Sequence, residues 1–205
     1  MRARGRPVPD GRFGAAALNA EADAATQGVR DDVFIRPLDV ADVADYADLR
    51  VAAVDDAPSA FWPTRDEEMG RSTAEIAARL QPTRHQTVFG AFHQQQLIGI
   101  AGLRREALRQ VRHKGTVWGL FVAPQWRRQG IARALLQAVI ARARELGDMV
   151  QIHLYVNAEN PSAHALYASL GFVVYGREPR SMRVGGTYYD EELMVLFLDR
   201  APLQA

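Results

Sequence analysis

Cysteine is absent from the 205 residues of this sequence. Its absence excludes structural disulfides, metal sites built from thiolates, and catalysis through an acyl-cysteine intermediate. Lysine is nearly absent as well, because Lys114 is the only one and arginine supplies almost all of the positive charge. We attribute this bias to genome composition, which favours arginine and alanine codons, rather than to a selection of arginine throughout the chain for phosphate binding.

The sequence also lacks a strong net charge and a long apolar run. The formal net charge is +1, so no overall field would draw the chain to nucleic acid. No apolar run is long enough to cross a bilayer, and the arginine-containing N-terminus lacks the apolar segment of a secretory signal. We therefore expect a cytoplasmic protein without nucleic-acid or membrane partners, and we predict no metal site.

The composition that remains is that of an ordinary globular protein, with 48% hydrophobic and 24% charged residues. A chain of this length can bury a full core as one domain. Residues 1–32 combine arginine, proline and glycine with small residues and show no sustained period. We predict a disordered tail there, with an over-long gene start or a weak transit-like segment as alternatives, and a single domain over residues 33–200.

Apolar periodicity and turn residues predict the order strand, helix, helix, three strands, helix, strand, helix and two strands. The crossover from Thr116 to Val156 implies a parallel pair, and the hairpins around it imply antiparallel pairs, so we predict an α/β protein with a mixed sheet covered by helices. Asp39 is expected to cap a first helix, and Thr64 with Glu67 to form a capping box on a second helix that breaks near Gly70. The face of the first helix is expected to carry Val43, Ala47, Val51 and Val54. The remaining ranges are strands at 33–36, 87–92, 97–104, 116–122, 152–156, 172–175 and 188–197, and helices over 129–146 and from Asn160 to Gly171.

The segment Arg127-Arg128-Gln129-Gly130-Ile131-Ala132 joins a predicted strand to the clearest predicted helix. A helix N-terminus offers several free N–H groups to a phosphate, and a glycine lets the phosphate oxygens approach the backbone. Arg127, Arg128 and Arg133 add positive charge suited to phosphate. On the residues alone, a basic surface loop before an amphipathic helix explains the pattern equally well. Neither the P-loop motif nor the Gly-x-Gly-x-x-Gly dinucleotide motif is present.

This Arg-x-x-Gly-x-Ala stretch, after a strand ending in Val-x-Pro, resembles the cofactor motif of the GCN5-related N-acetyltransferase (GNAT) superfamily. A second stretch with Asn160, Ala163, Tyr167 and Phe172 resembles the family's Asn…Ala…Leu-Tyr…Gly-Phe motif at the expected spacing. The resemblance covers residues 33–198 in element order and 118–172 in motif detail. It implies the GNAT-like acyl-CoA N-acyltransferase fold, acetyl-CoA as co-substrate, and direct attack of a primary amine on the thioester in a ternary complex.

The resemblance also implies roles for individual residues near the cofactor. The strand before the loop is expected to splay from its neighbour, so that the backbone of Phe121 and Val122 binds the pantetheine arm and acetyl carbonyl, with the Val122 amide stabilising the oxyanion. Tyr167 is expected to donate a proton to the departing thiolate, and Asn160 to contact the pantetheine arm or nearby loop backbone. On the residues alone, Tyr167 is equally a packed helix aromatic and Asn160 only a helix cap. The pyrophosphate is expected to lie against Arg127, Arg128, Gln129, Gly130, Ile131, Ala132 and Arg133.

The general base and the acceptor pocket are less constrained by the sequence. Many relatives carry an acidic residue on the strand before the loop, but residues 116–120 contain none. The candidates for the base are Glu67, Glu68, Glu106, His153 and Tyr188. By the resemblance, Phe61, Glu67 and Tyr188 are expected to bind the acceptor, where acidic and aromatic groups would suit a cationic amine. The alternative is that Glu67 only caps its helix and Phe61 only fills the core.

Three functions remain open at this point. The first is acetylation of a primary amine of a small molecule, such as a polyamine, an amino acid or an aminoglycoside-like compound. The second is acetylation of a protein N-terminus or lysine, because residues 160–172 also resemble ribosomal-protein acetyltransferases. The third is a sensor domain that binds acyl-CoA without catalysis. The sequence does not determine which acceptor or acyl chain the protein uses, or whether it forms a homodimer.

Overall fold

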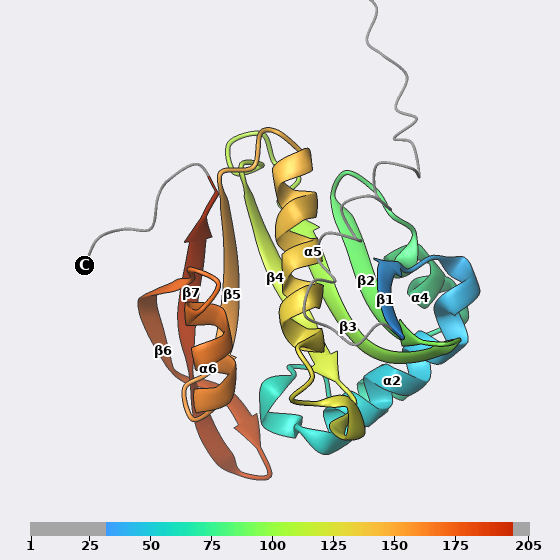
Figure 1. Ribbon diagram of the computed structural model, residues 1–205. Helices are drawn as coiled ribbons and strands as arrows, with labels where there is room; N and C mark the ends of the chain where they lie inside the picture. Colours follow the sequence, from blue (N-terminus) through green and yellow to red (C-terminus); the bar gives the residue numbers. More distant parts are fainter. Residues whose placement is uncertain (1–31, 199–205) are drawn as a thin grey trace, which may run out of the picture.

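The computed structural model describes residues 32–198, which form a seven-stranded mixed sheet with helices on both faces (Figure 1). The strand order is β1-β2-β3-β4-β5-β7-β6, and every neighbouring pair is antiparallel except β4 and β5. The tail predicted over residues 1–32 lies, apart from Asp32, outside the described residues. No helix within residues 32–198 is both long and apolar enough to cross a membrane.

The predicted order of elements is confirmed. The strands are β1 (Val33–Pro37), β2 (Gln86–His93), β3 (Gln96–Arg105), β4 (Lys114–Val122), β5 (Gln151–Asn157), β6 (Val173–Val184) and β7 (Thr187–Phe197). The helices are α2 (Val43–Asp56), α3 (Arg65–Met69), α4 (Thr73–Leu80), α5 (Ile131–Glu145) and α6 (Pro161–Ala168), with the 3-10 turns η1 (Val40–Asp42), η2 (Pro58–Ala60) and η3 (Pro124–Trp126). The Thr64–Glu67 capping box and the break at Gly70 are both present.

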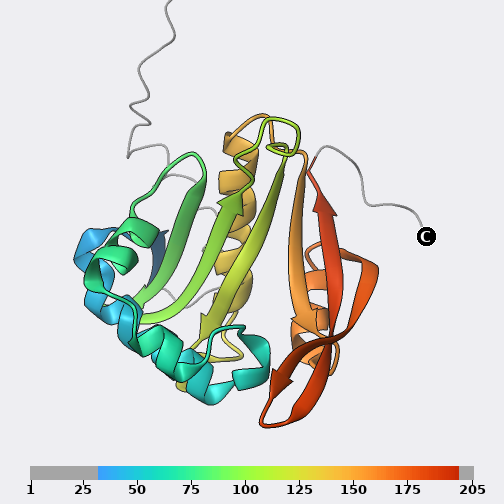
Figure 2. The same cartoon turned by 180° about the vertical axis from the view of Figure 1, so that it is seen from behind.

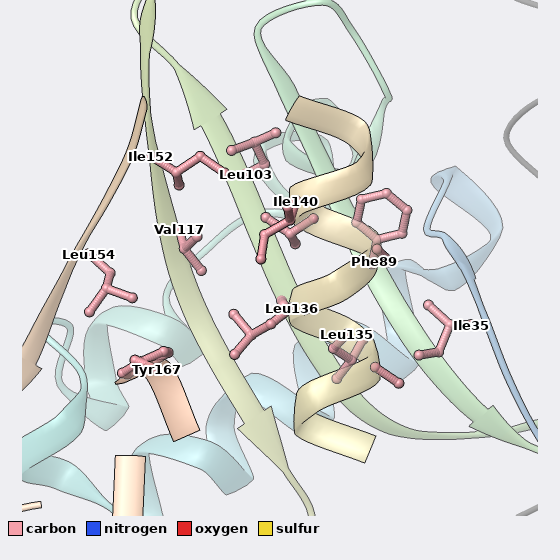
Figure 3. Packing of buried hydrophobic residues seen from close by; sticks show 14 of the residues in the cluster. Ile35, Phe89, Leu103, Val117, Leu135, Leu136, Ile140, Ile152, Leu154 and Tyr167 are labelled. Atoms are coloured by element: carbon pink, nitrogen blue, oxygen red, sulfur yellow. The ribbon is translucent and has the colours of Figure 1, made fainter. Parts of the chain in front are cut away.

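Two apolar clusters hold the helices to opposite faces of the sheet. The first cluster packs α5 and Tyr167 of α6 onto one face, with Leu135, Leu136 and Val139 fully buried (Figure 3). The second packs α2 and α4 onto the other face, which the view in Figure 2 brings to the front. Glycines in the left-handed region bound α5 at both ends, with φ of +79° at Gly130 and +72° at Gly147.

The single parallel pair, β4 with β5, is very short. Its register covers only Lys114 with Gln151, Gly115 with Ile152, and Thr116 with His153. Beyond this point the two strands diverge, whereas β5 stays paired with β7 along its whole length (Figure 2). The backbone of β4 from Val117 to Val122 therefore has no β5 partner, as the family resemblance implies.

A bulge lies within this part of β4, which is paired with β3 but not with β5. Its register against β3 shifts between the pairs Gly102–Trp118 and Ile100–Phe121, which places one extra residue in β4. Gly119 takes up the bulge with φ of +65°, a left-handed conformation that glycine adopts without a steric cost. Bulges of this kind turn backbone groups and side chains away from the regular ladder.

Four local predictions were wrong. The most buried residues of α2 are Tyr46, Leu49, Arg50, Ala53 and Val54, whereas the predicted Val43, Ala47 and Val51 are only half-buried. The buried face of α2 was predicted wrongly because a charged residue, Arg50, lies at its centre. Asp39 caps η1 rather than α2, and α5 begins at Ile131, two residues late, because Gly130 is its left-handed N-cap. Finally, β6 runs to Val184 rather than ending at Tyr175, because the polar arginine-rich segment after Tyr175 pairs with β7 without apolar alternation.

Candidate active site

The loop between β4 and α5 presents free backbone amides at a helix start. The first-turn N–H groups of α5 have no acceptor within the helix, and Gly130 places no side chain over them. Arg128 also has a left-handed backbone, with φ of +65°. For a residue other than glycine this conformation costs about 1–2 kcal/mol, and such strain is concentrated at functional sites. The geometry fits an anionic group at this helix end.

The arginines around this loop differ in what their side chains bind. Arg127 donates from Nε to the carbonyl of Val122 at 3.0 Å, forms an ion pair with Asp56, and lies over the Phe121 ring at 5.6 Å. Its guanidinium therefore ties the loop to α2 and to the end of β4. Arg133 donates to the Ser169 hydroxyl at 2.7 Å and so connects α5 to the end of α6. The guanidinium groups of both arginines are therefore bound to other groups of the protein.

Phe121 and Val122 are buried at the end of β4, directly before the loop. Val122 is paired with Gly99 of β3, and its carbonyl accepts the bond from Arg127. Because β4 and β5 have already diverged, this strand end can offer backbone groups on the side that faces β5. This placement agrees with the role predicted for the two residues, which stays a prediction.

Tyr167 lies on α6 and is only 7% exposed. Its ring packs edge-to-face on Phe172, with centroids 5.9 Å apart, in the cluster that includes Leu154 of β5 (Figure 3). Burial raises the pKa of Tyr167 to about 12. The phenol is therefore protonated at neutral pH and can act as a donor. Asn160 caps α6 by accepting from the Ala163 amide at 3.1 Å, which confirms its capping role.

A pocket of about 440 Å³ opens on the opposite face of the sheet, beside the bulge of β4. Its aromatic walls come from the segment after η2, from β4 and from β5, as Phe61, Trp62, Trp118 and Tyr155. Phe61 also packs edge-to-face on Phe121, with centroids 6.2 Å apart. The pocket and the strand end beside the loop are thus joined through one aromatic contact.

The structure does not bring together the three residues predicted to bind the acceptor. Phe61 lines the pocket. Glu67 caps α3 by accepting from the Thr64 amide at 2.7 Å, and it borders an adjoining depression that shares Trp62 and Arg71 with the pocket. Tyr188 lies on the β6–β7 hairpin, 52% exposed, within cation–π range of Arg180 and Arg183. Phe61 alone among them is therefore at this pocket.

Among the other candidates for a base, Glu68 is engaged in ion pairs. It is buried and binds Arg50 at 2.6 Å and Arg71 at 3.1 Å. Burial alone would raise the pKa of Glu68, but the bonds and charges of the two arginines outweigh it and hold this pKa below 4.5. A carboxylate held so firmly in its ionised form is a poor proton acceptor.

His153 and Glu106 lie on and near the same face of the sheet. The ring nitrogens of His153 lie 3.1 Å from the Tyr175 hydroxyl and 2.9 Å from the Gln151 amide. Burial and the charge of Lys114 lower the pKa of His153, against a smaller opposing effect of Glu106. Glu106 is half-buried and lines the pocket. Of these two, Glu106 is the group on the pocket wall.

Glu191 is a pocket carboxylate that the sequence analysis missed. It lies on β7, is 4% exposed, and lines the pocket. Its carboxylate accepts from the Trp62 indole at 3.1 Å and from the Ser181 hydroxyl at 2.6 Å. In the sequence it is the middle residue of Asp190-Glu191-Glu192, and a run of three acidic residues is typical of a solvent-exposed part of a strand. Nothing in that run distinguishes the one acidic residue that turns inward.

The family model described as the acetyltransferase (GNAT) family matches residues 51–172, more than half of the chain. The chain belongs to the GNAT acetyltransferase family. The match begins within α2 and includes the loop between β4 and α5 and Tyr167. It agrees with the resemblance drawn from the two motifs.

Curated relatives of this GNAT protein differ in the acceptors that their names give. It is 29% identical over 157 residues to an aminoglycoside N(6')-acetyltransferase type 1 of Stenotrophomonas maltophilia, a match covering 71% of this chain and 92% of that one. It is 29% identical over 84 residues to the spermidine N(1)-acetyltransferase of Vibrio cholerae, covering 41% and 49%. It is 41% identical over 59 residues to the ribosomal protein bS18-alanine N-acetyltransferase of Escherichia coli, covering 29% and 39%. The chain thus spans less than half the length of the last two.

Solved structures support the same fold. A GNAT-family acetyltransferase of Streptococcus pneumoniae superimposes with a TM-score of 0.73 at 22% identity, covering 80% of this chain and 98% of that one. A putative acetyltransferase of Salmonella typhimurium, solved with its cofactor acetyl-CoA, superimposes with a TM-score of 0.69 at 24% identity, covering 84% and 98%. The mixed sheet with a diverging β4–β5 pair is therefore the GNAT fold.

Proposed function

We propose that this GNAT protein, through a domain over residues 33–200, transfers an acetyl group from acetyl-CoA to a primary amine of a small molecule. The observation that carries the proposal is the position of β4. The segment of β4 that lacks a β5 partner ends just before the loop with the free amides at Gly130, and the bulge of the same segment, at Gly119, borders the pocket. One strand thus connects a place for a phosphate-bearing cofactor to a place for an acceptor. Family membership and the acetyl-CoA in the Salmonella relative support this assignment.

The chemistry follows from groups at the two ends of this path. Acetyl-CoA supplies an acyl group activated as a thioester. In this proposal the Val122 amide polarises the carbonyl and stabilises the developing oxyanion. The amine forms the new C–N bond, the C–S bond breaks, and the buried Tyr167 phenol supplies a proton to the thiolate. The proton lost by the amine needs an acceptor in the pocket.

We assign that acceptor to Glu191 rather than to an acid on β4. Its carboxylate lines the pocket, and its two hydrogen-bond donors, Trp62 and Ser181, fix its orientation. Glu68 is excluded by its ion pairs, and Glu67 lies at the other depression. A carboxylate on β7 can thus replace the acid that residues 116–120 lack.

The dimensions of the pocket favour a small acceptor. About 440 Å³ bounded by four aromatic side chains is typical of a small-molecule site. The identity to a ribosomal-protein acetyltransferase keeps acetylation of a protein amine as the second candidate. Acyl-CoA binding without catalysis, as a sensor, is the third.

One experiment separates these functions. The full chain is incubated with acetyl-CoA and two panels, small primary amines and short peptides, and thiol release is recorded. We expect release with members of the small-amine panel. Release only with peptides would favour the second candidate. Acetyl-CoA binding measured by calorimetry, without thiol release from either panel, would refute catalysis and favour a sensor.

A further inference from the structure

The pocket that we assign to the acceptor is rich in arginine. Four guanidinium groups line it, and three carboxylates accompany them. The arginines are Arg50, Arg71, Arg79 and Arg104, and the carboxylates are Glu106, Glu191 and Glu68, the last bound to Arg50 and Arg71. Arg71 and Arg79 also lie beside Glu67 and Glu75 of the adjoining depression, so Arg50 and Arg104 are the guanidinium groups to consider for a ligand.

Arg50 has donors that the protein itself does not satisfy. Its side chain is 4% exposed, and Nη2 donates to Glu68 at 2.6 Å. Nε and Nη1 are buried without a hydrogen-bond partner. Nη1 lies 3.0 Å from the position that a Cβ at Gly119 would take, so this end of the guanidinium reaches the bulge of β4. Burying donors without partners destabilises a protein, so a ligand that accepts from them gains affinity.

We propose that the acceptor is an amino carboxylate, whose amine is acetylated and whose carboxylate is bound by Arg50 with help from Arg104. This inference rests on the proposed N-acetyltransferase function. Each free donor of Arg50, Nε and Nη1, can give one charge-assisted N–H···O bond to a carboxylate oxygen. A carboxylate carries one negative charge, whereas a phosphate monoester carries about −1.5 to −2 and would need more compensation in a pocket that already contains carboxylates.

The rest of the acceptor should be apolar. Arg50 already lies over the Phe61 ring at 5.0 Å, and Arg79 over the Trp118 ring at 5.5 Å. Trp62 and Tyr155 pack edge-to-face across the pocket, with centroids 5.5 Å apart. These rings leave aromatic surface facing the space between the arginines and Glu191. The structure thus assigns a free amino acid with an apolar side chain as the class of acceptor.

The test compares acceptors that share an amine and differ only in the carboxylate. Pairs of amino acid and amino-acid amide, such as leucine with leucinamide and phenylalanine with phenylalaninamide, are assayed with the full chain by thiol release. We expect kcat/KM for the acid to exceed that for the amide by at least about tenfold, the size of one charge-assisted hydrogen bond. Equal rates within each pair, or faster rates with the amides, would overturn the inference.

Two variants connect this preference to the arginines. Arg104→Gln removes an exposed guanidinium that forms no ion pair within residues 32–198. The double variant Arg50→Gln with Glu68→Gln removes both members of the buried pair, so that the only charge that loses a partner is Arg71, which is partly exposed to solvent. We expect the acid-to-amide ratio to fall towards one in both. Arg84→Gln, on the exposed connection between α4 and β2, is the matched control and should keep the ratio.

The ratio separates specific from general effects. A variant that merely damages the fold lowers both rates and leaves their ratio unchanged, and this result in both pocket variants would overturn the role of the arginines. Thiol release with amines or amides but with no amino acid would refute this inference and leave the proposed function intact. Measurable acetyl-CoA binding without release from any member of the panel would refute both.

Discussion

Substitution of Gly130 tests whether the loop between β4 and α5 binds phosphate, because Gly147 at the other end of the same helix provides a matched control. Gly130 precedes α5 with φ of +79°, and Gly147 follows it with φ of +72°. A leucine at either position must adopt a left-handed backbone, which costs about 1–2 kcal/mol. Around Gly147 the nearest atom to an added Cβ is 4.0 Å away, so that position has room for a side chain. Gly130→Leu and Gly147→Leu should therefore lose similar stability.

Only one of the two substitutions should affect the cofactor. At Gly130 the new side chain lies over the free amides of α5, whereas Gly147 is at the far end of the helix. We expect Gly130→Leu to weaken acetyl-CoA binding at least tenfold, about 1.4 kcal/mol, and Gly147→Leu to leave it unchanged. Urea unfolding measures the stability of both variants and calorimetry measures their affinity. Equal acetyl-CoA affinity in the two variants would refute the loop assignment.

Three further predictions concern the buried polar groups. Tyr167→Phe should lower kcat about 10²-fold or more while the calorimetric affinity for acetyl-CoA changes little, and an equal loss of both would return Tyr167 to a packing role. Glu191→Gln should lower kcat about 10²–10⁴-fold, whereas Glu67→Gln, at the adjoining depression, should not, and similar rates in the two variants would refute the base. Glu68→Gln leaves Arg50 with one partner fewer and should cost about 3–5 kcal/mol of unfolding free energy at pH 7. The folded-state pKa of Glu68 lies below its ordinary value of 4.5. The stability difference between the wild type and Glu68→Gln, measured by urea unfolding, should therefore have its full size above pH 4.5 and shrink as the pH falls through the folded-state pKa. A difference that stays constant with pH would contradict the ion pair.

The order of the elements could be predicted because it depends on local chemistry. The capping box at Thr64, the break at Gly70 and the left-handed glycines around α5 are each specified by a few neighbouring residues. The residues predicted to bind the cofactor stay a prediction. Most of them, from Phe121 to Arg133, lie on one strand–loop–helix segment that the family motif spans, and for this reason a sequence pattern could nominate them.

The acceptor half depends on contacts between distant residues. Arg50 and Glu68 are 18 positions apart, and their pairing buries a charge where periodicity expects an apolar side chain. Glu191 turns inward because Trp62, 129 positions earlier, donates to it. No local pattern indicates either contact. The pocket therefore became visible only with the tertiary structure.

The three residue pairs between β4 and β5 have a mechanical consequence. They form a narrow seam between two antiparallel blocks of the sheet, β1 to β4 and β5 to β7, and the apolar cluster around α5 contacts both blocks. The Val122 amide and the phosphate loop belong to the first block, and Tyr167 and Glu191 to the second. A small rotation about the seam produces its largest displacement at the open end, where these groups face one another. The distance between the halves of the proposed catalytic machinery is thus set by these three pairs together with the contacts that join the blocks elsewhere, such as Arg133 with Ser169 and Trp62 with Glu191.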